Sequence, residues 1–337
     1  MFLFATVTDP IGGLCRTRAA PGTRSPPYRR RRIRGTGDGT DQEKADARVR
    51  AHAVAGPYRR SRSVTPSASS SRSREASVEA AAEPSADPDA LLGTAMKSVT
   101  VEDGADVAVA VLDMESGRSA THGRGTFGTA SIVKVDILAA LLLQAQDAGR
   151  HLSARERSYA TVMIENSDND SASALWTAIG QADGLDSANK RFGLTDTKGG
   201  DGGLWGLTRT TAADQLVLLQ QVFGDDSRLS EGSRAYLQGL MGNIAEDQDW
   251  GVSAVADGSR WALKNGWLPR STTGLWNVNS IGRVTADGRD CLVAALSNGN
   301  TTKAMGISLV EAAAQAAVSA FRDAAWFRDG VELGCDE

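Results

Sequence analysis

The stretch TASIVKVDILAALLL, residues 129–143, places a serine and a lysine at the beginning of an apolar run. Lys134 follows Ser131 by three positions, and residues with this spacing lie on one face of a helix, so the ammonium group can meet the hydroxyl. Such a serine can be a nucleophile if burial or a neighbouring cation lowers the pKa of the lysine, which then serves as the base. The alternative is a lysine that extends from a buried helix to solvent.

Other nucleophile arrangements have little support in the sequence. His122 and His151 are the only histidines after residue 86, and neither occurs in a setting typical of a catalytic triad. The G-x-S-x-G nucleophile motif of many hydrolases is absent. A second S-x-x-K pattern, from Ser187 to Lys190, lies in the polar stretch LDSANKRFG and indicates a solvated helix face. Lys134 is therefore the nearest candidate base for Ser131.

Two further motifs follow in a fixed order. They are ENSDND, with Ser167, Asp168 and Asn169, and LKNGW, with Lys264, Asn265 and Gly266. Together with the first motif, they resemble S-x-x-K, S-D-N and K-T-G, the three motifs of class A β-lactamases and penicillin-binding proteins. The resemblance runs from about Asp89 to the end of the last predicted helix, and it includes the helical segments around S-D-N and a first hairpin, VAVAVLDMESGR.

The resemblance implies a catalytic role for four of these side chains. Ser131 would be the acylated nucleophile, with Lys134 as the base that activates it. Ser167 would relay a proton to the leaving nitrogen, and Lys264 would lie on the edge of the sheet facing Ser167. The backbone N–H groups of Ser131 and Trp267 would form the oxyanion hole, where loss of one donor typically costs about 3 to 4 kcal/mol of barrier.

The same motifs imply the substrate side of the site. Asn169 would bind the amide side chain of the substrate, and Asn265, Gly266 and Trp267 would line it along the third motif. Asn265 stands where the family has a hydroxyl residue, and its bulkier side chain carries both a donor and an acceptor. Asp168 is interpreted as structural, holding the loop through backbone hydrogen bonds. SDND by itself is also compatible with a plain helix cap.

The largest departure from the family concerns the loop that carries, in class A β-lactamases, a glutamate that activates the deacylating water. The matching region, residues 193–211, is short, and no glutamate occurs between Glu165 and Glu231. Asp196 or Asp201 could substitute, although an aspartate reaches one methylene group less far. The sequence therefore predicts an acyl-enzyme that forms at a measurable rate and is hydrolysed slowly.

Three functions are compatible with these motifs. The first is a serine hydrolase that acts on β-lactams through a Ser131 acyl-enzyme. The second is a D-Ala-D-Ala peptidase or esterase of the same fold, and the third is a non-catalytic binding protein that retains the cleft. The expected partner is a small molecule, a β-lactam or an acyl-peptide, and we expect a monomer. No metal or organic cofactor is implied, because the mechanism needs none and no ligand cluster occurs.

The order of the elements predicts an α+β fold. Strand patterns occur in the first hairpin and again in RWALKNGW, GLWNVNSIGRV and RDCLVAALSNG, whereas helical patterns dominate from Ser131 to about Phe223. A last helix is predicted near ISLVEAAAQAAVSAFRDAAWF. Strands from both ends of the domain can pair in one antiparallel sheet, flanked by terminal helices, with a mostly helical lobe beside it. The stretch from Ser131 to Ser167 is shorter than in class A enzymes, which indicates that the lobe lacks a connecting segment.

Residues 1–86 are rich in Arg, Ser, Ala and Pro, which predicts a disordered extension before a folded domain, 87–337. Its arginines are able to bind nucleic acid or anionic lipid, whereas no nucleic-acid partner is expected for the folded domain. RRRRIR, residues 29–34, resembles a twin-arginine export signal without the hydrophobic segment that should follow. The family resemblance nevertheless implies an extracytoplasmic location, secreted or in the cell envelope.

Composition and cysteine usage set the remaining expectations. The chain has 337 residues, a net charge of −4 and 41% hydrophobic residues, enough to bury a sizeable core. No apolar run reaches the roughly 18 residues of a membrane helix, so no membrane span is expected. Cys15, Cys291 and Cys335 lack metal-ligand spacing. Cys291 lies in an apolar run that predicts a buried thiol, and a disulfide between Cys291 and Cys335 is left open.

Overall fold

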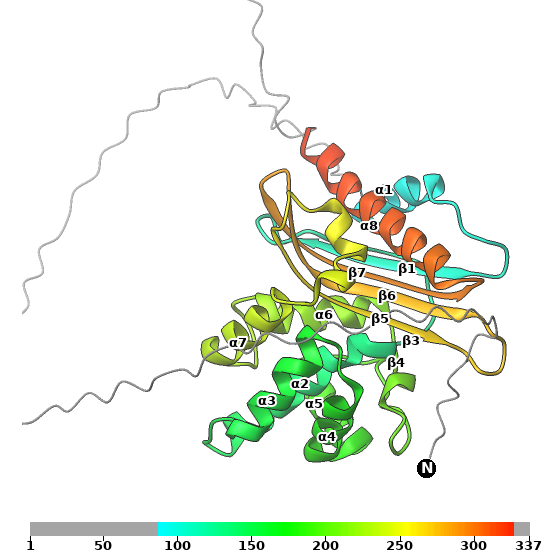
Figure 1. The fold of residues 1–337 in the computed structure, drawn as a ribbon. Coiled ribbons are helices and arrows are strands. Elements are labelled where there is room, and N and C mark those ends of the chain that lie inside the picture. Colours follow the sequence, from blue (N-terminus) through cyan, green and yellow to red (C-terminus); the bar gives the residue numbers. More distant parts are fainter. Residues whose placement is uncertain (1–86, 327–337) are drawn as a thin grey trace, which may run out of the picture. The chain divides into compact units, whose positions relative to one another are not determined.

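Five strands form one antiparallel sheet in the order β2-β1-β7-β6-β5 (Figure 1). They are β1 Asp106–Asp113, β2 Ser119–His122, β5 Trp261–Pro269, β6 Trp276–Ala286 and β7 Arg289–Asn300. The predicted first hairpin is confirmed, and its strand β1 pairs with β7, where Val109 lies opposite Ala295. One sheet therefore joins the two ends of the domain.

The computed structural model describes residues 87–326, which belong to one compact unit, Val78–Glu337. The predicted extension 1–86, with its arginine-rich stretch, and Cys335 lie outside the described residues. Cys291 is a free, buried thiol in β7, as its apolar run predicts, and burial raises its pKa to about 11.

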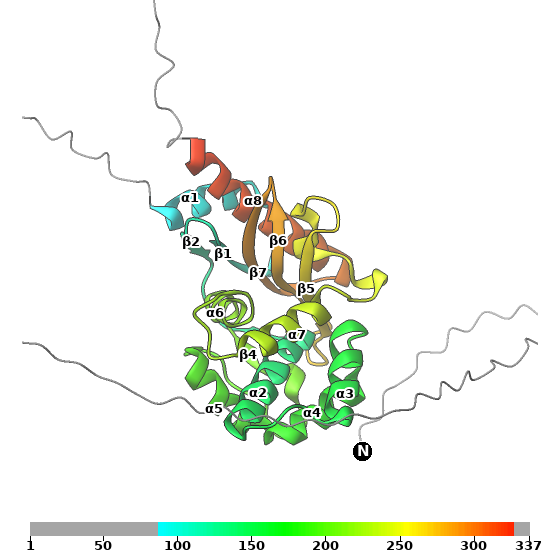
Figure 2. The ribbon, with the colours of Figure 1, turned by 90° about the vertical axis from the view of Figure 1, so that its left-hand side faces the viewer.

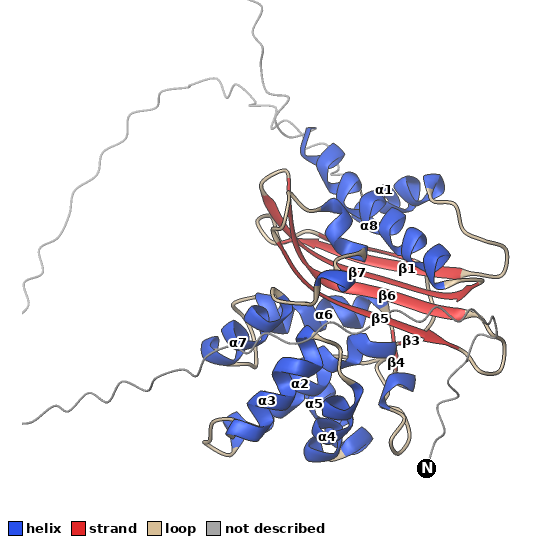
Figure 3. Ribbon diagram, in the orientation of Figure 1, coloured by secondary structure: helices blue, strands red, loops and turns tan. Residues whose placement is uncertain are grey.

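The two faces of the sheet are covered by different layers (Figures 1 and 3). Helix α8, Lys303–Trp326, lies across one face and contacts β1, β6 and β7, with α1, Pro88–Ala95, beside it. Side chains alternate along β5 between the two layers. Leu263 packs in the core under α8, whereas Ala262 packs in the core of the helical lobe. Lys264 has the same parity as Ala262, so the sheet presents it to the lobe.

Helix α8 meets the length and composition criteria for a membrane span over Lys303–Phe321, contrary to the expectation that no apolar run is long enough. In the fold, however, 56% of its apolar window is buried inside the domain. Packing against the sheet accounts for an apolar helix of this length, because one helix that covers several strands needs a broad apolar face.

Six helices between Val133 and Met241 form the lobe on the other face of the sheet (Figure 2). They are α2 Val133–Asp147, α3 Ala154–Glu165, α4 Asn169–Ile179, α5 Gln181–Phe192, α6 Ala212–Phe223 and α7 Glu231–Met241. Every residue of α2 from Val133 to Leu143 is buried, which explains why its sequence is an apolar run without a polar face. Sheet, terminal helices and helical lobe confirm the predicted α+β fold.

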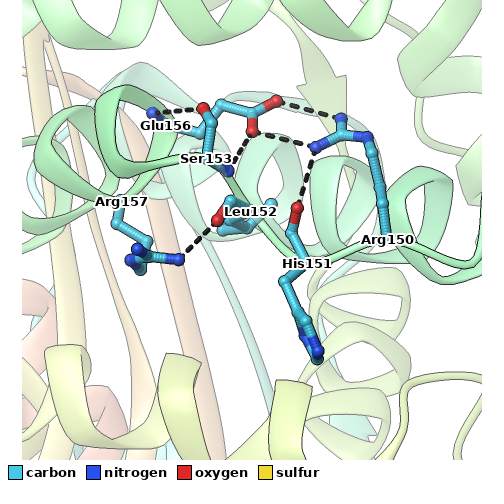
Figure 4. Close-up of polar contacts among 6 residues, drawn as sticks. All are labelled: Arg150, His151, Leu152, Ser153, Glu156 and Arg157. Atoms are coloured by element: carbon cyan, nitrogen blue, oxygen red, sulfur yellow. Dashed lines mark hydrogen bonds and ion pairs between the residues drawn. The ribbon is translucent and has the colours of Figure 1, made fainter.

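A short connection, residues 148–153, joins α2 to α3 (Figure 4). Arg150 donates two hydrogen bonds to the carboxylate of Glu156, at 2.9 and 3.0 Å. The backbone N–H of Glu156 donates to the Ser153 hydroxyl (3.2 Å), and the N–H of Ser153 donates to the Glu156 carboxylate (2.7 Å), which completes a capping box. The connection fixes α3, which leads to Ser167, relative to α2.

Candidate active site

The candidate nucleophile lies in a strained turn directly before α2. Ser131 is the middle residue of the short 3-10 helix η2, Ala130–Ile132, and is partly exposed. Ala130 has a φ of 47°, a left-handed conformation that residues with a side chain seldom adopt. The strand pair β3, Phe127–Gly128, and β4, Arg209–Thr210, holds the preceding residues. Strain of this kind persists only where the surrounding structure fixes it, and it is common at functional sites.

Two asparagines of β6 attach this turn to the sheet. Asn279 is fully buried, and its amide donates to the carbonyls of Gly128 (2.9 Å) and Thr129 (3.0 Å). Asn277 donates to the carbonyl of Gly128 over 3.4 Å. The sequence pattern predicts a strand here and does not single out either asparagine. Two asparagines two positions apart in a strand share one face, and that pattern was the available signal.

Gly266 brings the edge strand β5 against the nucleophile. A Cβ atom at this position would lie 2.7 Å from the backbone nitrogen of Ser131 and 2.8 Å from that of Ile132, closer than real Cβ contacts. Only a residue without a side chain allows the two backbones to approach in this way. The structure thus brings the third motif next to the first.

Lys134 is fully buried and directs its amine to the second motif. Its Nζ donates to the Ser167 carbonyl (2.6 Å), to the Ser167 hydroxyl (3.2 Å) and to Oδ1 of Asn169 (2.9 Å). Within the described residues, Ser131 forms no side-chain hydrogen bond with Lys134. The helical spacing of the first motif therefore brings the two residues to the same end of α2, but the amine contacts Ser167 in this state.

Ser167 lies between two lysines. Its hydroxyl accepts from Lys134 and also from Nζ of Lys264 on β5, at 3.0 Å. Lys264 is fully buried, and its amine also donates to the Asn265 carbonyl (3.0 Å) and to Oε1 of Gln248 (3.5 Å). Ser167 has a φ of 58°, so the site contains a second left-handed residue. The structure brings Ser167, Lys134 and Lys264 together, as the resemblance implied.

Burial controls the charge of both amines. It lowers the pKa of Lys134 from 10.5 to about 7, against the opposing effect of the Asp168 carboxylate. The pKa of Lys264 is also lowered well below its ordinary value, first by burial and then by the nearby charge of Lys134. Two buried amines that share one hydroxyl therefore do not both stay charged at neutral pH. A neutral amine has a lone pair that can accept a proton.

Asp168 has a structural place, as predicted. It is the N-cap of α4, where its carboxylate accepts from the backbone N–H of Ser171 at 2.7 Å. Hydrogen bonding to Ser171 lowers the pKa of Asp168, so its negative charge persists beside Lys134. The next residue, Asn169, is exposed and reaches Lys134 through its Oδ1.

The side chain of Asn265 is not where the resemblance led us to expect it. It is fully buried, and its amide donates to the carbonyls of Gln248 (2.8 Å) and Trp250 (2.9 Å). Trp267, two positions later, packs its half-buried ring on the same side, with its centroid 3.7 Å from Nζ of Lys303. Alternation along β5 explains both positions, because Lys264 and Gly266 occupy the opposite face. The side chain of Asn265 is therefore buried away from the proposed substrate site, contrary to the expectation from the resemblance.

The loop that precedes α6 presents an indole to the site. The ring centroid of Trp205, in the 3-10 helix η3 Trp205–Leu207, lies 4.9 Å from Nζ of Lys134. The two aspartates of this loop do not take that place. Asp196 accepts from the Thr195 hydroxyl (3.2 Å), Asp201 is exposed, and Asp168 is the carboxylate that acts on the pKa of Lys134. The idea that Asp196 or Asp201 replaces the missing glutamate thus has no support in the geometry of the described residues.

A separate cavity of about 630 Å³ lies in the lobe, between the α2–α3 connection and the start of α7. Its lining includes Leu142, Arg150, His151, Arg157 and Tyr236, and none of the candidate catalytic residues. The candidate site is therefore the junction of sheet and lobe rather than this cavity. The second S-x-x-K pattern lies on an exposed face of α5, as predicted.

Fold and site together define a class, the β-lactamases and penicillin-binding proteins, in which an antiparallel sheet and a helical lobe hold two lysines around a serine. The chain belongs to the β-lactamase enzyme family, whose model matches residues 142–321. The matched range contains Ser167 and Lys264 and begins after Lys134. The assignment of Ser131 and Lys134 therefore depends on the first motif and on the contacts described above.

The curated relatives are mycobacterial. A protein described as "Putative lipoprotein LppW", from Mycobacterium tuberculosis strain ATCC 25618 / H37Rv, is 27% identical over 175 residues, 49% of this chain and 55% of the relative. Its counterpart in Mycobacterium bovis matches equally. The chain thus spans about half the length of the curated relatives it matches.

Solved structures share the fold. A class A β-lactamase from Bacteroides cellulosilyticus DSM 14838 has a TM-score of 0.59 at 16% identity, covering 70% of this chain and 99% of that chain. PBP-A has a TM-score of 0.60 at 19% identity, covering 69% and 96%. The extended-spectrum β-lactamase TLA-3 has a TM-score of 0.60 at 15% identity, covering 69% and 98%. Likeness at these identities concerns the fold alone.

Proposed function

We propose that this protein is a serine hydrolase that opens β-lactams through a Ser131 acyl-enzyme and releases the product slowly. The observation that carries the proposal is the Ser167 hydroxyl, which accepts hydrogen bonds from Lys134 at 3.2 Å and from Lys264 at 3.0 Å. Burying two amines around one hydroxyl costs desolvation energy that apolar side chains would not cost. A role in proton transfer to and from a substrate explains why two buried lysines are placed around the Ser167 hydroxyl.

Acylation uses the groups at the junction of sheet and lobe. The neutral amine of Lys134 takes the proton of Ser131 while Oγ bonds to the lactam carbonyl carbon. The carbonyl oxygen becomes an oxyanion, and the backbone N–H groups of Ser131 and Trp267 are its proposed donors. The proton reaches the lactam nitrogen through the Ser167 hydroxyl as the bond between nitrogen and carbonyl carbon breaks. Lys134 contacts Ser167 in the free protein, and catalytic hydrogen bonds often tighten only when substrate binds.

Substrate binding is assigned to the exposed side of the same junction. Asn169 is exposed while its Oδ1 is held by Lys134, so its amide nitrogen is available to a carbonyl of the substrate. Gly266 leaves room along β5, where a side chain would collide with the nucleophile's backbone. We propose a small-molecule substrate, a β-lactam or an acyl-peptide, and a monomeric protein.

Slow release follows from the composition of the loop before α6. A positioned general base typically contributes about 100- to 10,000-fold to a rate, and the loop offers an indole, Trp205, in place of a carboxylate near Lys134. The same observation favours the second candidate function, a D-Ala-D-Ala peptidase or esterase with slow turnover. A non-catalytic binding protein with this cleft would instead gain no covalent mass from penicillin.

The location of the protein is a further proposal. The mycobacterial relative is described as "Putative lipoprotein LppW", and this supports an extracytoplasmic site of action, secreted or in the cell envelope.

Replacing the nucleophile tests the proposal. We expect Ser131→Ala to abolish labelling by a fluorescent penicillin on a denaturing gel, with an unchanged circular dichroism spectrum, because only one side-chain oxygen of a partly exposed residue is removed. Ser187→Ala, in the second S-x-x-K pattern, is the matched control and should label like the wild type. Labelling that survives in Ser131→Ala, or that disappears in Ser187→Ala, would mean that the nucleophile is wrongly assigned.

A further inference from the structure

The Lys134 amine is enclosed by polar partners on one side and by an aromatic ring on another. Its Nζ donates to two oxygens of Ser167 and to one of Asn169, at 2.6 to 3.2 Å. The Trp205 ring lies over it, with the centroid 4.9 Å away. The helix η3 that carries Trp205 also contacts η2, which carries Ser131. The amine is therefore closed to bulk solvent, and the segment that carries the ring lies next to the segment that carries Ser131.

Trp205 is held in this position by several contacts. Its Nε1 donates to the Ser173 hydroxyl at 3.1 Å, and that hydroxyl donates to the Asn169 carbonyl at 2.9 Å. The loop itself is tied to α4, because Nε1 of the buried Trp176 donates to the Gly202 carbonyl at 2.6 Å. The ring is thus connected to the S-D-N segment rather than carried on an unattached loop.

The neighbours of Trp205 differ from it in exposure. Leu204 and Leu207 are 45% and 37% exposed, whereas Trp205 is half-buried and packs against the lobe core. Of three apolar residues in this segment, the tryptophan is the one turned toward the lysine. The polar Asp201 is exposed, so the segment presents a ring to Lys134 and a carboxylate to solvent.

We propose that Trp205 is a positioning residue that excludes water from the Lys134 side of the Ser131 site, so that an acyl group on Ser131 is retained. The proposal rests on the proposed function and adds the structural device that slows release. Hydrolysis requires a water oxygen to bond to the acyl carbon and its proton to pass to a base. The bond from that carbon to Ser131 Oγ then breaks, and Oγ regains a proton. With the indole in place, no water can lie between the Lys134 amine and the ester.

Removal of the ring should admit water and speed release. We expect Trp205→Ala to shorten the lifetime of the fluorescent penicilloyl adduct at least about tenfold, while the rate of labelling changes less than about threefold, because Lys134 becomes a base for the admitted water. Trp205→Phe keeps a ring and should keep the wild-type lifetime. Leu204→Ala, an exposed neighbour, is the matched control. An unchanged lifetime in Trp205→Ala, or an equal shortening in Trp205→Phe, overturns the proposal.

A second measurement does not depend on acylation. Cyanate carbamylates accessible neutral amines, and peptide mass spectrometry locates the products. We expect Lys134 to be protected in the wild type and in Trp205→Phe but modified in Trp205→Ala, with exposed Lys190 modified and buried Lys264 protected in all three. If Lys134 of the wild type reacts as readily as Lys190, or stays protected without the ring, Trp205 is not its cover. If penicillin does not acylate the wild type, the proposed function and the retention of an ester both fail, while the cyanate result still decides the covering role.

Discussion

Lys134 is fully buried, and its pKa of about 7 makes its charge sensitive to pH near neutrality. Only the neutral amine can take the Ser131 proton. We therefore expect the rate constant for acylation by penicillin to rise with pH through an inflection near pH 7 and to level off above it. Because Lys264 shares the Ser167 hydroxyl, the inflection belongs to the lysine pair.

Quenched-flow measurement of acylation between about pH 5 and pH 9 checks this expectation. A rate that does not vary over this range contradicts the assignment of Lys134 as the base. A rate that keeps rising up to about pH 9 without levelling off contradicts it equally, because the amine would then keep a pKa near the ordinary value of lysine and would not be desolvated.

Asp136, two positions later in α2, is a buried carboxyl that affects the stability of the fold rather than the proposed chemistry. Burial raises its pKa from 3.8 to about 7, against the hydrogen bond donated by Asn189 at 3.1 Å. Between these two values the folded state retains a proton that the unfolded chain has lost. The free energy of unfolding therefore falls as the pH rises from about 4 to about 7 and is unaffected by this group above that range.

Replacing this carboxyl by an amide removes the buried charge. We expect Asp136→Asn to be more stable than the wild type at about pH 8, by up to about 4 kcal/mol, since each unit of pKa shift corresponds to about 1.4 kcal/mol. The difference should become small below about pH 3, where the carboxyl is protonated in both the folded and the unfolded wild type. Urea denaturation at the two pH values measures it, and a destabilised variant at pH 8 would show that the charge has a partner we have not recognised.

At the scale of elements, the contact between β6 and the turn before Ser131, residues 128–131, holds the nucleophile against the sheet. Asn279→Ala leaves the buried carbonyls of Gly128 and Thr129 without this donor, which should cost about 1 to 3 kcal/mol of stability. Acylation should slow as well, because the turn holds Ser131. Asn277→Ala removes only the longer hydrogen bond to Gly128 and should have a smaller effect on both quantities. Equal effects of the two variants would argue against a specific role of Asn279.

The helices and strands were predictable to different degrees. Alternation and apolar runs located the first hairpin, the strands β5, β6 and β7, and the helices α2, α3, α4, α6 and α8. Helix α7 was missed because EGSRAYLQGLM contains two glycines, which weaken a helical pattern, and begins with a polar stretch. It is nevertheless a helix, since Leu237, Leu240 and Met241 pack in the lobe core. The Ser230 cap, which accepts from Ser233 at 3.3 Å, was the unused signal.

The order of the motifs allowed the residues of the site to be predicted. The directions of their side chains could not be predicted in the same way. The order of motifs brought Ser131, Lys134, Ser167 and Lys264 into one hypothesis, and the structure brings the last three into contact. The buried side chain of Asn265 lies on the face of β5 opposite Lys264, and this follows from strand alternation rather than from motif order. Trp205 could not be predicted, because its place over Lys134 depends on a loop held by distant residues of α4.

At the scale of the whole domain, the candidate site lies where the sheet meets the helical lobe. Ser131, Lys134 and Ser167 belong to the lobe side, whereas Lys264 and Gly266 belong to the sheet. The two layers have separate hydrophobic cores, one within the lobe and one under α8. Membership of the β-lactamase family is consistent with this arrangement. The loop before α6, residues 193–211, contains no glutamate.

The central claim, an acyl-enzyme on Ser131 that forms readily and persists, is tested most directly by time-resolved intact-mass spectrometry of the full chain mixed with penicillin. We predict a gain equal to the mass of one penicillin molecule, located on the peptide that contains Ser131, which accumulates to near one equivalent before slow loss. With a chromogenic cephalosporin, the same protein should give a burst of about one equivalent followed by slow turnover. No gain in mass, or fast steady hydrolysis without a detectable adduct, would contradict the claim.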